Sequence, residues 1–279
     1  MQPNLEDVQR IILTALGEDI GHGDITTAAI IPPEAEGRFQ LTAREPMVVC
    51  GLPLIMHVFY AVDPSIDFNQ RLDDGAQAQA GDELASVLGP AGSILTAERV
   101  ALNLLQRMCG VATETAHYVQ AVAGTGAIIL DTRKTMPGLR ALDKYAVRVG
   151  GGHNHRMRLD DAILIKDNHI AIAGSVSEAL ARAKAQAPAT LTIEVECDTL
   201  DQVREALSAG AQRLLLDNMD NSTLREAVAL AKGKNATCEA SGNVSLQSVR
   251  AIAETGVDYI SVGRLTHSVR NMDIGLDSM

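Results

Sequence analysis

From residue 127 onward, short aliphatic runs alternate with helical segments, and this alternation constrains the fold more than any other feature of the chain. Parallel strands need long crossover connections, which are usually helices, so repeated strand–helix units indicate a parallel sheet. We therefore expect an α/β domain. Its expected strands comprise residues 127–130, 162–165, 191–195, 213–216, 236–239 and 259–262.

Helices between these strands carry recognisable start signals. Ser175, Thr199 and Thr223 are each followed three residues later by Glu or Gln. This is the spacing of a capping box, in which two side chains bond to otherwise unpaired amides of the first helical turn. No Gly-x-Gly-x-x-Gly motif opens a helix after any strand. The pattern therefore favours a closed or nearly closed β/α barrel over a doubly wound dinucleotide-binding sheet.

The first part of the chain has a different texture. Apolar residues at helical spacing predict an opening helix over residues 5–16 that ends at Gly17. A long helix-rich segment covers residues 96–123, with Gly110 as a point where it could break. We predict a small α+β domain with a boundary near residue 124. Pro, Gly and Asp cut its remaining apolar stretches into lengths typical of antiparallel strands, at residues 37–43, 47–51 and 83–88.

The charge balance excludes several classes of function. The chain has 24 Lys and Arg against 35 Asp and Glu, a net charge of −11. This is the wrong sign for a protein that binds nucleic acid or anionic membranes. No apolar run approaches the roughly 18 residues that would span a bilayer, and the N-terminus is acidic where a signal peptide would be basic. We expect a cytoplasmic protein that binds neither nucleic acid nor membrane.

Four cysteines lie far apart in the sequence, with no Cys-x-x-Cys pair among them. This spacing suggests neither a zinc site nor a disulfide framework. We expect buried free thiols at Cys50, Cys109, Cys197 and Cys238.

Polar residues follow each of the expected strands. In a β/α barrel the loops after the strands surround one mouth, which carries the active site. A single polar residue at a strand end is often an ordinary turn residue, but a whole succession of them indicates a functional rim. These polar segments are residues 131–135, 166–169, 196–197, 217–219, 241–243 and 263–267.

Basic residues are concentrated in one part of this acidic chain. Between Asp131 and His169 lie three of the seven histidines and eight of the 24 Lys and Arg. Arginine forks bind carboxylates or phosphates through paired hydrogen bonds, and lysine supplies a point charge, so the cluster predicts a small polyanionic substrate. Three of the eight, at helix-like spacing, favour instead a solvated helix face or an interface. The eight are Arg133, Lys134, Arg156, Arg158 and Lys166, with Arg140, Lys144 and Arg148 at the helical spacing.

Two loops and two carboxylates suggest the chemistry of the anion. Residues 241–243 and 262–263 follow the last two expected strands, where barrel enzymes commonly hold a phosphate on backbone amides. Glu196 and Asp217 end neighbouring strands, where they could bind Mg²⁺ through water, accept hydrogen bonds from sugar hydroxyls or act as a general acid/base pair. The triple glycine at 150–152 would let the backbone approach a ligand.

These motifs resemble the quinolinate phosphoribosyltransferases, also called carboxylating nicotinate-nucleotide pyrophosphorylases. The similarity runs over essentially the whole chain, and the motifs follow one another in the expected order. They are residues 18–27 (EDIGHGDITT), 98–99 (ER), 101–103 (ALN), 131–138 (DTRKTMPG), 144–147 (KYAV), 150–156 (GGGHNHR), 165–169 (IKDNH), 194–196 (EVE), 216–218 (LDN) and 241–243 (SGN).

The resemblance implies a type II phosphoribosyltransferase fold. Its N-terminal α/β sandwich domain would comprise residues 1–115, and an open α/β barrel would comprise residues 116–267. A C-terminal tail, residues 268–279, would return to the first domain. The resemblance also implies a homodimer with shared active sites, and it leaves higher oligomers open.

The implied reaction joins quinolinate and phosphoribosyl pyrophosphate to give nicotinate mononucleotide, pyrophosphate and CO₂ with Mg²⁺, in the synthesis of NAD. Position in the motifs implies catalytic roles for Lys134, Lys166, Glu196 and Asp217, with Glu196 and Asp217 also at the metal. The implied quinolinate residues are Thr132, Arg133, His155, Arg156 and Lys166, with Arg99 from a neighbouring subunit. The implied phosphoribosyl pyrophosphate residues are Lys134, Glu196, Asp217, Ser241, Gly242, Asn243, Val262, Gly263 and Arg264.

The chain departs from the family pattern at three positions. Val100 replaces an expected Thr, Arg264 an expected small residue, and His153 lies in a variable position after the glycines. One rival interpretation is the molybdenum-associated paralogue of the family, which would act on another pyridine or base. A second is a non-catalytic sensor of a pyridine dicarboxylate or a nucleotide. The cations at the barrel mouth argue against the first, and the paired carboxylates Glu196 and Asp217 argue against the second.

Overall fold

The chain passes four times between two structural units. The N-terminal unit contains residues up to Ala116, Thr135–Gly151 and Leu265–Met279, and the barrel unit contains His117–Lys134 and Gly152–Arg264. The computed structural model describes residues 3–188 and 190–279. Residues 135–151, which the sequence boundaries assign to the barrel, group with the N-terminal unit.

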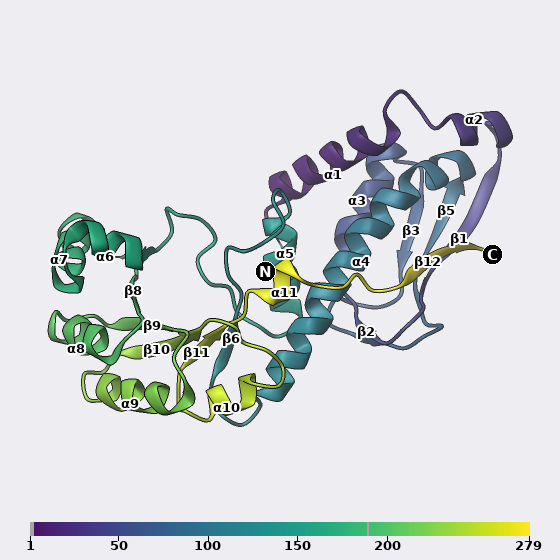
Figure 1. Ribbon diagram of the computed structural model, residues 1–279. Coiled ribbons are helices and arrows are strands. Elements are labelled where there is room, and N and C mark those ends of the chain that lie inside the picture. Colours follow the sequence, from purple (N-terminus) through teal and green to yellow (C-terminus); the bar gives the residue numbers. More distant parts are fainter. Residues whose placement is uncertain (1–2, 189) are drawn as a thin grey trace. The chain divides into compact units, whose positions relative to one another are not determined.

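The N-terminal unit is built on an antiparallel sheet (Figure 1). Its strand order is β12 (Ile274–Ser278), β1 (Glu36–Ala43), β5 (Glu83–Pro90) and β3 (Asp67–Gln70). Leu41 of β1 pairs with Leu276 of β12, so the C-terminal tail returns to this unit as expected. The other elements of the unit are α1 (Leu5–Ile20), α2 (Ile25–Ile30), β2 (Met47–Val48), α3 (Leu52–Val62), β4 (Gln77–Ala78) and α5 (Arg140–Val149).

Helix α3 supplies much of the core of this unit. Leu52, Ile55, Val58 and Phe59 are buried along it, and the helix packs against β3 and α1. The Phe59 ring lies 5.8 Å from the ring of Phe68, measured between centroids. Aromatic pairs at this separation add to the stabilisation from apolar burial alone.

One expectation for the helices of this unit was wrong, since helix α1 continues through Gly17 to Ile20, with Gly17 in helical geometry at an exposed position. Of the two interpretations of helix α5, the solvated face does not hold for Lys144, which is completely buried. On the same helix the Arg148 guanidinium lies 5.8 Å from the centre of the Tyr145 ring.

The long helix α4 (Ala91–Ala121) passes through Gly110 without a break. A Cβ atom at Gly110 would lie 2.2 Å from the carbonyl oxygen of Arg270. Gly150 is similar, since a Cβ there would lie 2.4 Å from the carbonyl oxygen of Ala112. The absence of a side chain at Gly110 therefore lets the backbone of Arg270 approach α4. At Gly150 it lets the backbone pack closely against α4, where we had expected an approach to a ligand.

The barrel unit contains a parallel sheet with the order β6 (Ile128–Leu130), β11 (Tyr259–Ser261), β10 (Thr237–Ser241), β9 (Arg213–Asp217), β8 (Ile193–Cys197) and β7 (Ile163–Ile165). All six strands were predicted, within a few residues. The end strands β6 and β7 do not pair with each other in the described part of the chain. The sheet is therefore an open α/β barrel.

The connection from β6 to β7 differs from the other connections of the sheet, because its helix α5 belongs to the N-terminal unit. The first strand β6 pairs with the last strand β11. An isolated bridge between Leu130 and His153 extends the β6 edge.

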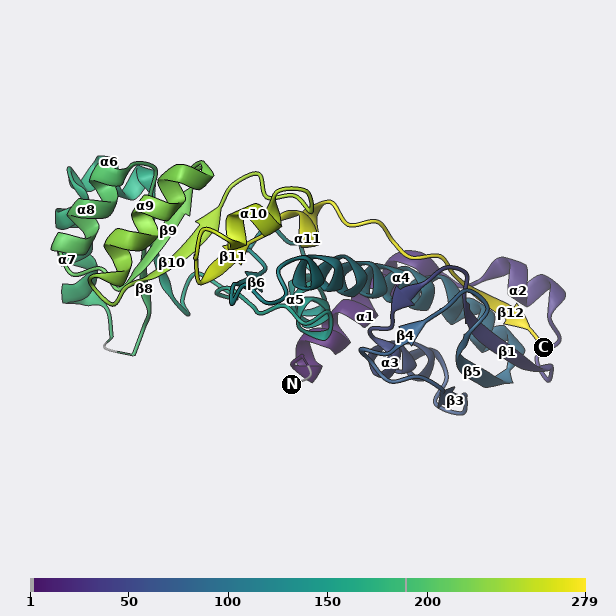
Figure 2. The same cartoon turned by 90° about the horizontal axis from the view of Figure 1, so that it is seen from below.

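Helices cover the strands of this unit (Figure 2). Helix α7 (Val176–Gln186) contacts β7 and β8, α8 (Leu200–Ser208) contacts β8, and α9 (Asn221–Lys232) contacts β10. Helix α10 (Val249–Ala253) contacts β11. Helix α6 (Asp167–Ala173) follows β7, and α11 (Arg264–His267) follows β11 and ends in the N-terminal unit.

Two of the three predicted helix starts are confirmed. Ser175 caps α7, and Thr199 forms a capping box with Gln202 at the start of α8. The third was wrong, because the side chain of Asp220 accepts the amide of Thr223 at 2.7 Å and α9 begins three residues earlier. An ionised Asp is at least as good an N-cap as Thr.

All four cysteines are free and buried, as expected. Burial raises the pKa of the thiols of Cys109, Cys197 and Cys238 to about 12. No helix in the described residues is long and apolar enough to cross a membrane.

We predict opposite effects of the same substitution at two helical glycines. Gly110→Ala should lower the free energy of unfolding by about 1–3 kcal/mol, because the new methyl group would overlap the Arg270 carbonyl. Gly17→Ala, with no atom within 4 Å of its Cβ position, should raise it by about 1 kcal/mol through helix propensity. Urea denaturation measures both, and equal effects would contradict the packing role of Gly110.

Candidate active site

A cavity of about 400 Å³ lies at the carboxyl ends of the strands in the barrel unit. Every strand of the sheet contributes to its lining, directly or through the residues that follow it. The lining residues are Thr132, Arg133, Lys134, His155, Arg156, Leu164, Lys166, Glu196, Leu215, Asp217, Glu239, Ser241 and Ser261. Convergence of one strand end after another on a single cavity is typical of barrel active sites.

One side of the cavity is cationic. Arg133 and Lys134 follow β6, Lys166 follows β7, and Arg156 lies on the loop between them. Burial and the nearby charge of Arg133 lower the pKa of Arg156. Like charges placed together favour an anionic ligand, which would relieve their repulsion.

Hydrogen bonds hold one of these charged groups and the backbone at two others. The Arg156 guanidinium donates to the carbonyl of Ala162 at 2.9 Å. The amide of Lys166 donates to Nδ1 of His169 at 2.9 Å, at the start of α6. The amide of Lys134 donates to the hydroxyl of Thr132 at 3.0 Å.

The other side of the cavity is acidic. Glu196 and Asp217 come from the neighbouring strands β8 and β9. Burial raises the pKa of Glu196, and the charge of Asp217 adds to this, while Lys166 opposes it. The Lys166 ammonium lies 3.5 Å from a Glu196 oxygen. A partly buried pair of carboxylates is a donor set that suits a hard divalent cation such as Mg²⁺.

The loops after β9 and β10 adopt left-handed backbone conformations. Asn218 has φ 52°, Gly242 has φ 97° and Asn243 has φ 48°. A Cβ atom at Gly242 would lie 2.2 Å from Oδ1 of Asn218, so only glycine fits there. The Asn218 amide donates to the carbonyl of Ser241 at 2.9 Å, and the Asn243 amide nitrogen Nδ2 donates to Oδ1 of Asn218 at 3.2 Å.

A charged network lies inside the barrel below this cavity. Arg213 donates to Glu194 through Nε at 2.9 Å and to Glu239 through Nη2 at 3.2 Å. His155 Nε2 lies 3.0 Å from Glu194 Oε2 and 3.6 Å from Glu239 Oε2. The Arg213 guanidinium also lies 4.5 Å from the centre of the Tyr259 ring.

The histidine and two glutamates of this network offer donor atoms within 4.8 Å of one another, a spacing that a metal ion could use. A guanidinium already pairs with both carboxylates. We therefore assign the cluster to internal ion pairing.

The loop that carries His155 and Arg156 is fixed by Asp131, which is fully buried. Its carboxylate accepts the side-chain amide of Asn154 at 2.6 Å and the backbone amide of His155 at 2.9 Å. Both ring nitrogens of His155 have protein partners, because Nδ1 accepts the amide of Arg156 at 2.8 Å. The geometry therefore gives this histidine a place in the wall and leaves no ring nitrogen aimed at a ligand.

Nine of the residues expected at the site line the cavity together, from Thr132 to Ser241. Five others belong to the same unit but are not part of the lining, namely Gly242, Asn243, Val262, Gly263 and Arg264. The amide of Val262 donates to the carbonyl of Leu130 at 2.9 Å. Arg99 lies on α4 in the N-terminal unit.

Sequence reasoning did not identify four lining residues, Leu164, Leu215, Glu239 and Ser261. A signal for two of them was present. Alternate residues of a strand face the same side, so Glu239 shares a face with Ser241, and Leu215 shares one with Asp217.

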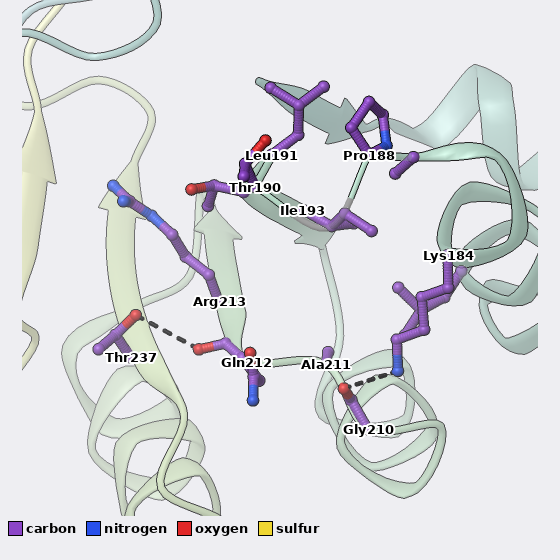
Figure 3. A pocket seen from close by; sticks show the side chains of 13 residues that line it. Lys184, Pro188, Thr190, Leu191, Ile193, Gly210, Ala211, Gln212, Arg213 and Thr237 are labelled. Carbon is purple, nitrogen blue, oxygen red and sulfur yellow. Dashed lines mark hydrogen bonds between the residues drawn. The ribbon is translucent and has the colours of Figure 1, made fainter. Parts of the chain in front are cut away.

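A second hollow, of about 520 Å³, lies at the amino ends of β8, β9 and β10 (Figure 3). It contains Lys184 and Arg213, which would suggest an anion site. However, Lys184 donates to the carbonyls of Ala209 and Gly210 at 2.9 Å, and the Arg213 guanidinium donates to Glu194 and Glu239 and lies away from Lys184 in Figure 3. The two cations do not converge, so the hollow lacks the geometry of an anion site.

The fold and the charged cavity define a class: an open α/β-barrel enzyme with cationic and acidic side chains at its strand ends. Two family models match the chain. That for the N-terminal domain of quinolinate phosphoribosyl transferase matches residues 24–109, and that for the C-terminal domain matches residues 111–277. The chain belongs to the quinolinate phosphoribosyltransferase family.

Individual relatives agree. The nicotinate-nucleotide pyrophosphorylase [carboxylating] of Mycobacterium leprae is 47% identical over 272 residues, covering 95% of each chain. The mitochondrial quinolinate phosphoribosyltransferase [decarboxylating] 2 of Nicotiana glauca is 44% identical over 289 residues, covering 97% of this chain and 82% of that protein. The crystal structure of nicotinate-nucleotide pyrophosphorylase from Ehrlichia chaffeensis has a TM-score of 0.93 at 43% identity, covering 97% of this chain and 98% of that one.

We predict that Asp131→Asn loosens the loop that carries Arg156. An amide cannot accept from both present donors without presenting its own NH₂ to one of them, and the lost bond should cost about 1–3 kcal/mol of unfolding free energy. Hydrogen exchange of the His155 amide should become faster, while Asp160→Asn, at an exposed position of the same loop, should leave it unchanged. Unaltered exchange in the Asp131 variant would contradict the clamp.

Proposed function

We propose that this chain transfers the phosphoribosyl group of phosphoribosyl pyrophosphate to quinolinate, releasing pyrophosphate and CO₂ and forming nicotinate mononucleotide for NAD synthesis. The observation that carries this proposal is the division of one cavity into a cationic and an acidic side. Quinolinate is a dianion, and a pyrophosphate ester binds with a divalent cation, so the reaction needs both sides at once. The relatives named for quinolinate favour this substrate over another pyridine or base.

The cationic side is the proposed site for quinolinate. Arg133, Arg156 and Lys166 would bind its two carboxylates, since guanidinium forks match carboxylate geometry. Thr132 and His155 would form the adjacent wall. The Arg156 guanidinium is fixed in advance by its hydrogen bond to the Ala162 carbonyl, so it loses little freedom when the ligand binds.

The acidic side is the proposed site for phosphoribosyl pyrophosphate. Glu196 and Asp217 would hold Mg²⁺, directly or through water, and the ion when bound would neutralise charge on the pyrophosphate. Lys134 and Ser241 would contact the same substrate from the cavity wall. The loops at Gly242–Asn243 and Val262–Arg264 would supply further polar contacts at the rim, on the phosphate side.

The chemistry needs no nucleophile from the protein. The pyridine nitrogen of quinolinate forms a bond to C1 of the ribose as the C1–pyrophosphate bond breaks. The C2 carboxylate then leaves as CO₂, its bonding electrons remain on C2, and a proton takes its place. Lys166 is the proposed cation near that carbon. The contribution of the protein is orientation and charge stabilisation.

The direct test is an assay for nicotinate mononucleotide with purified protein, quinolinate, phosphoribosyl pyrophosphate and Mg²⁺. Product formation with quinolinate, and none with nicotinate or other pyridines, is the expected result. Binding of quinolinate without turnover would support the sensor interpretation instead. Turnover with a different base alone would support the molybdenum-associated paralogue.

We predict that substitutions on the two sides of the cavity separate the two substrates. Arg133→Ala should weaken quinolinate binding by about one to two orders of magnitude, since a charged hydrogen bond is worth about 1.5–3 kcal/mol. Asp217→Asn should raise the Mg²⁺ or phosphoribosyl pyrophosphate requirement and lower kcat, with quinolinate binding alone nearly unchanged. Calorimetry of each binary complex measures this, with Arg204→Ala on the exposed face of α8 as a control. The reverse pattern would exchange the proposed roles.

We also propose a homodimer in which Arg99 completes the quinolinate site of the partner subunit. The support is the match of residues 98–103 to the family motif. Closed two-fold symmetry would then create two composite sites in each dimer.

We predict complementation between two inactive variants of this dimer. Arg99→Ala and Lys134→Ala should each be nearly inactive, because each removes a cation from every site. In a mixed dimer one site would carry both changes and the other site neither. Random pairing in an equal refolded mixture makes about half of the dimers mixed, so about a quarter of all sites should regain activity. Native mass spectrometry verifies that mixed dimers form. Inactive mixed dimers would place Arg99 in its own subunit's site or in the interface only.

The proposed location is the cytoplasm, as the acidic composition and the substrates suggest. A relative from Nicotiana glauca is named as mitochondrial. Fractionation of the source cells would distinguish the two.

A further inference from the structure

The network below the cavity contains more acid than its paired base can neutralise. Two carboxylates, Glu194 and Glu239, share a single guanidinium, Arg213, and the fourth member, His155, carries a charge only when both of its ring nitrogens are protonated. Glu194 is 4% exposed and Glu239 is fully buried. A buried unbalanced charge is very unfavourable, so these four residues need one extra proton to be neutral among themselves. The Arg156 guanidinium also acts on Glu194.

The geometry of His155 argues against that proton being on the ring. Nδ1 accepts a hydrogen bond from the backbone amide of Arg156 at 2.8 Å, so the ring proton is on Nε2, which donates to Glu194 at 3.0 Å. Burial lowers the pKa of His155, and the two glutamates together raise it above its ordinary value. A second ring proton would nevertheless face the Arg156 N–H and break that hydrogen bond.

The geometry of Glu239 favours the proton there. Its Oε2 accepts from Arg213, while Oε1 has no hydrogen-bond partner of good geometry, although the Ser261 hydroxyl is near enough to lower the pKa of the carboxyl. A buried carboxylate oxygen without a donor is unfavourable, but a carboxylic acid can carry its proton on that oxygen. Burial and the charge of Glu194 raise the pKa of Glu239 to about 7, against the opposing effects of His155 and Arg213.

We propose that Glu239 is held as a neutral carboxylic acid and is a positioning residue for substrate binding, keeping the floor of the quinolinate site free of net negative charge. With Glu239 neutral, Glu194 and Arg213 cancel and His155 is uncharged. If Glu239 loses its proton, the floor gains one negative charge directly below a site that must accept a dianion. This inference rests on the proposed assignment of quinolinate to the cationic side of the cavity.

The groups that face Glu239 come from each neighbouring element. They are His155 on the loop before β7, Glu194 on β8, Arg213 on β9, and Tyr259 with Ser261 on β11. Arg213 forms charged hydrogen bonds to both glutamates, and Glu194 in turn bonds to His155. Arg213 therefore helps to hold His155 through Glu194. The loop that carries Arg156 is tied to the network by the Arg156 amide.

The test uses the intact protein and quinolinate alone, measured by calorimetry from pH 6 to pH 8.5. Wild-type affinity should fall by roughly five- to twentyfold as Glu239 ionises, a size set by one charge acting on a dianion at short range. Glu239→Gln, a neutral mimic of the acid, should match the wild type at pH 6 and bind more tightly than the wild type at pH 8.5. The effect should appear in KM for quinolinate more than in kcat, because the change is in binding.

Two other variants sharpen the test. Glu194→Gln leaves one carboxylate, Glu239, for one guanidinium, Arg213, so the network is neutral without an extra proton and the pH dependence of quinolinate affinity should disappear. Glu254→Gln, at an exposed carboxylate of the same unit, should reproduce the wild-type curve. Titration of the substrate itself is common to all of these proteins and cancels in the comparison.

Stability gives an independent readout. A raised pKa means that the folded protein holds a proton that the unfolded chain releases, so this group lowers stability as pH rises from about 4.5 to about 7. The melting temperature of the wild type should therefore fall across this range relative to that of Glu239→Gln. A tenfold loss of quinolinate affinity in Glu239→Gln at pH 6, with normal melting, would overturn the proposal, as would parallel affinity curves for the two proteins. Absence of wild-type binding at every pH would instead refute the proposed function.

Discussion

The parallel register of the barrel sheet is the constraint on which the site depends. Glu239 of β10 pairs with Leu215 of β9, and Glu196 of β8 pairs with the same Leu215, so these positions lie at one level. Because alternate residues share a face, the next inward position on β8 is Glu194 and on β9 is Arg213. A shift of one residue in any strand would exchange these groups with the apolar residues Val195 and Leu214. The network therefore spans two successive levels of the barrel interior, and its Glu239 lies at the level that also lines the cavity.

This arrangement explains how an acidic protein can bind an anion. The net charge of −11 acts over the whole surface and is screened by salt, whereas Arg133 and Arg156 act at short range inside a partly buried cavity. The Glu196 carboxylate beside Lys166 marks the change from the cationic to the acidic side. The cations thus follow the two end strands of the sheet, β6 and β7, and the acids Glu196 and Asp217 come from the inner strands β8 and β9.

The sequence predicted what local patterns control. All six strands of the barrel and the rim residues that follow them were identified, because aliphatic runs and their polar ends are local signals. The polar strand β3 was not, since Asp67–Gln70 has no apolar alternation and forms only through pairing with β5. The membership of residues 135–151 in the N-terminal unit also depends on long-range contacts. Neither is readable from composition or periodicity.

The inner charges were missed for a different reason. Glu194 and Glu239 look like ordinary strand residues in the sequence, and only the pairing of β8, β9 and β10 shows that both meet Arg213. An apolar floor of similar volume would be at least as stable as this network, because burying ion pairs has a large desolvation cost. An apolar floor would offer no hydrogen-bond partner to His155. The loop that carries Arg156 would then lose the support that it receives through the His155 ring. A polar network can hold that loop in one position, but only if the charges of the network balance. In our proposal the proton on Glu239 provides this balance, so the orientation of Arg156 depends on a single proton inside the barrel.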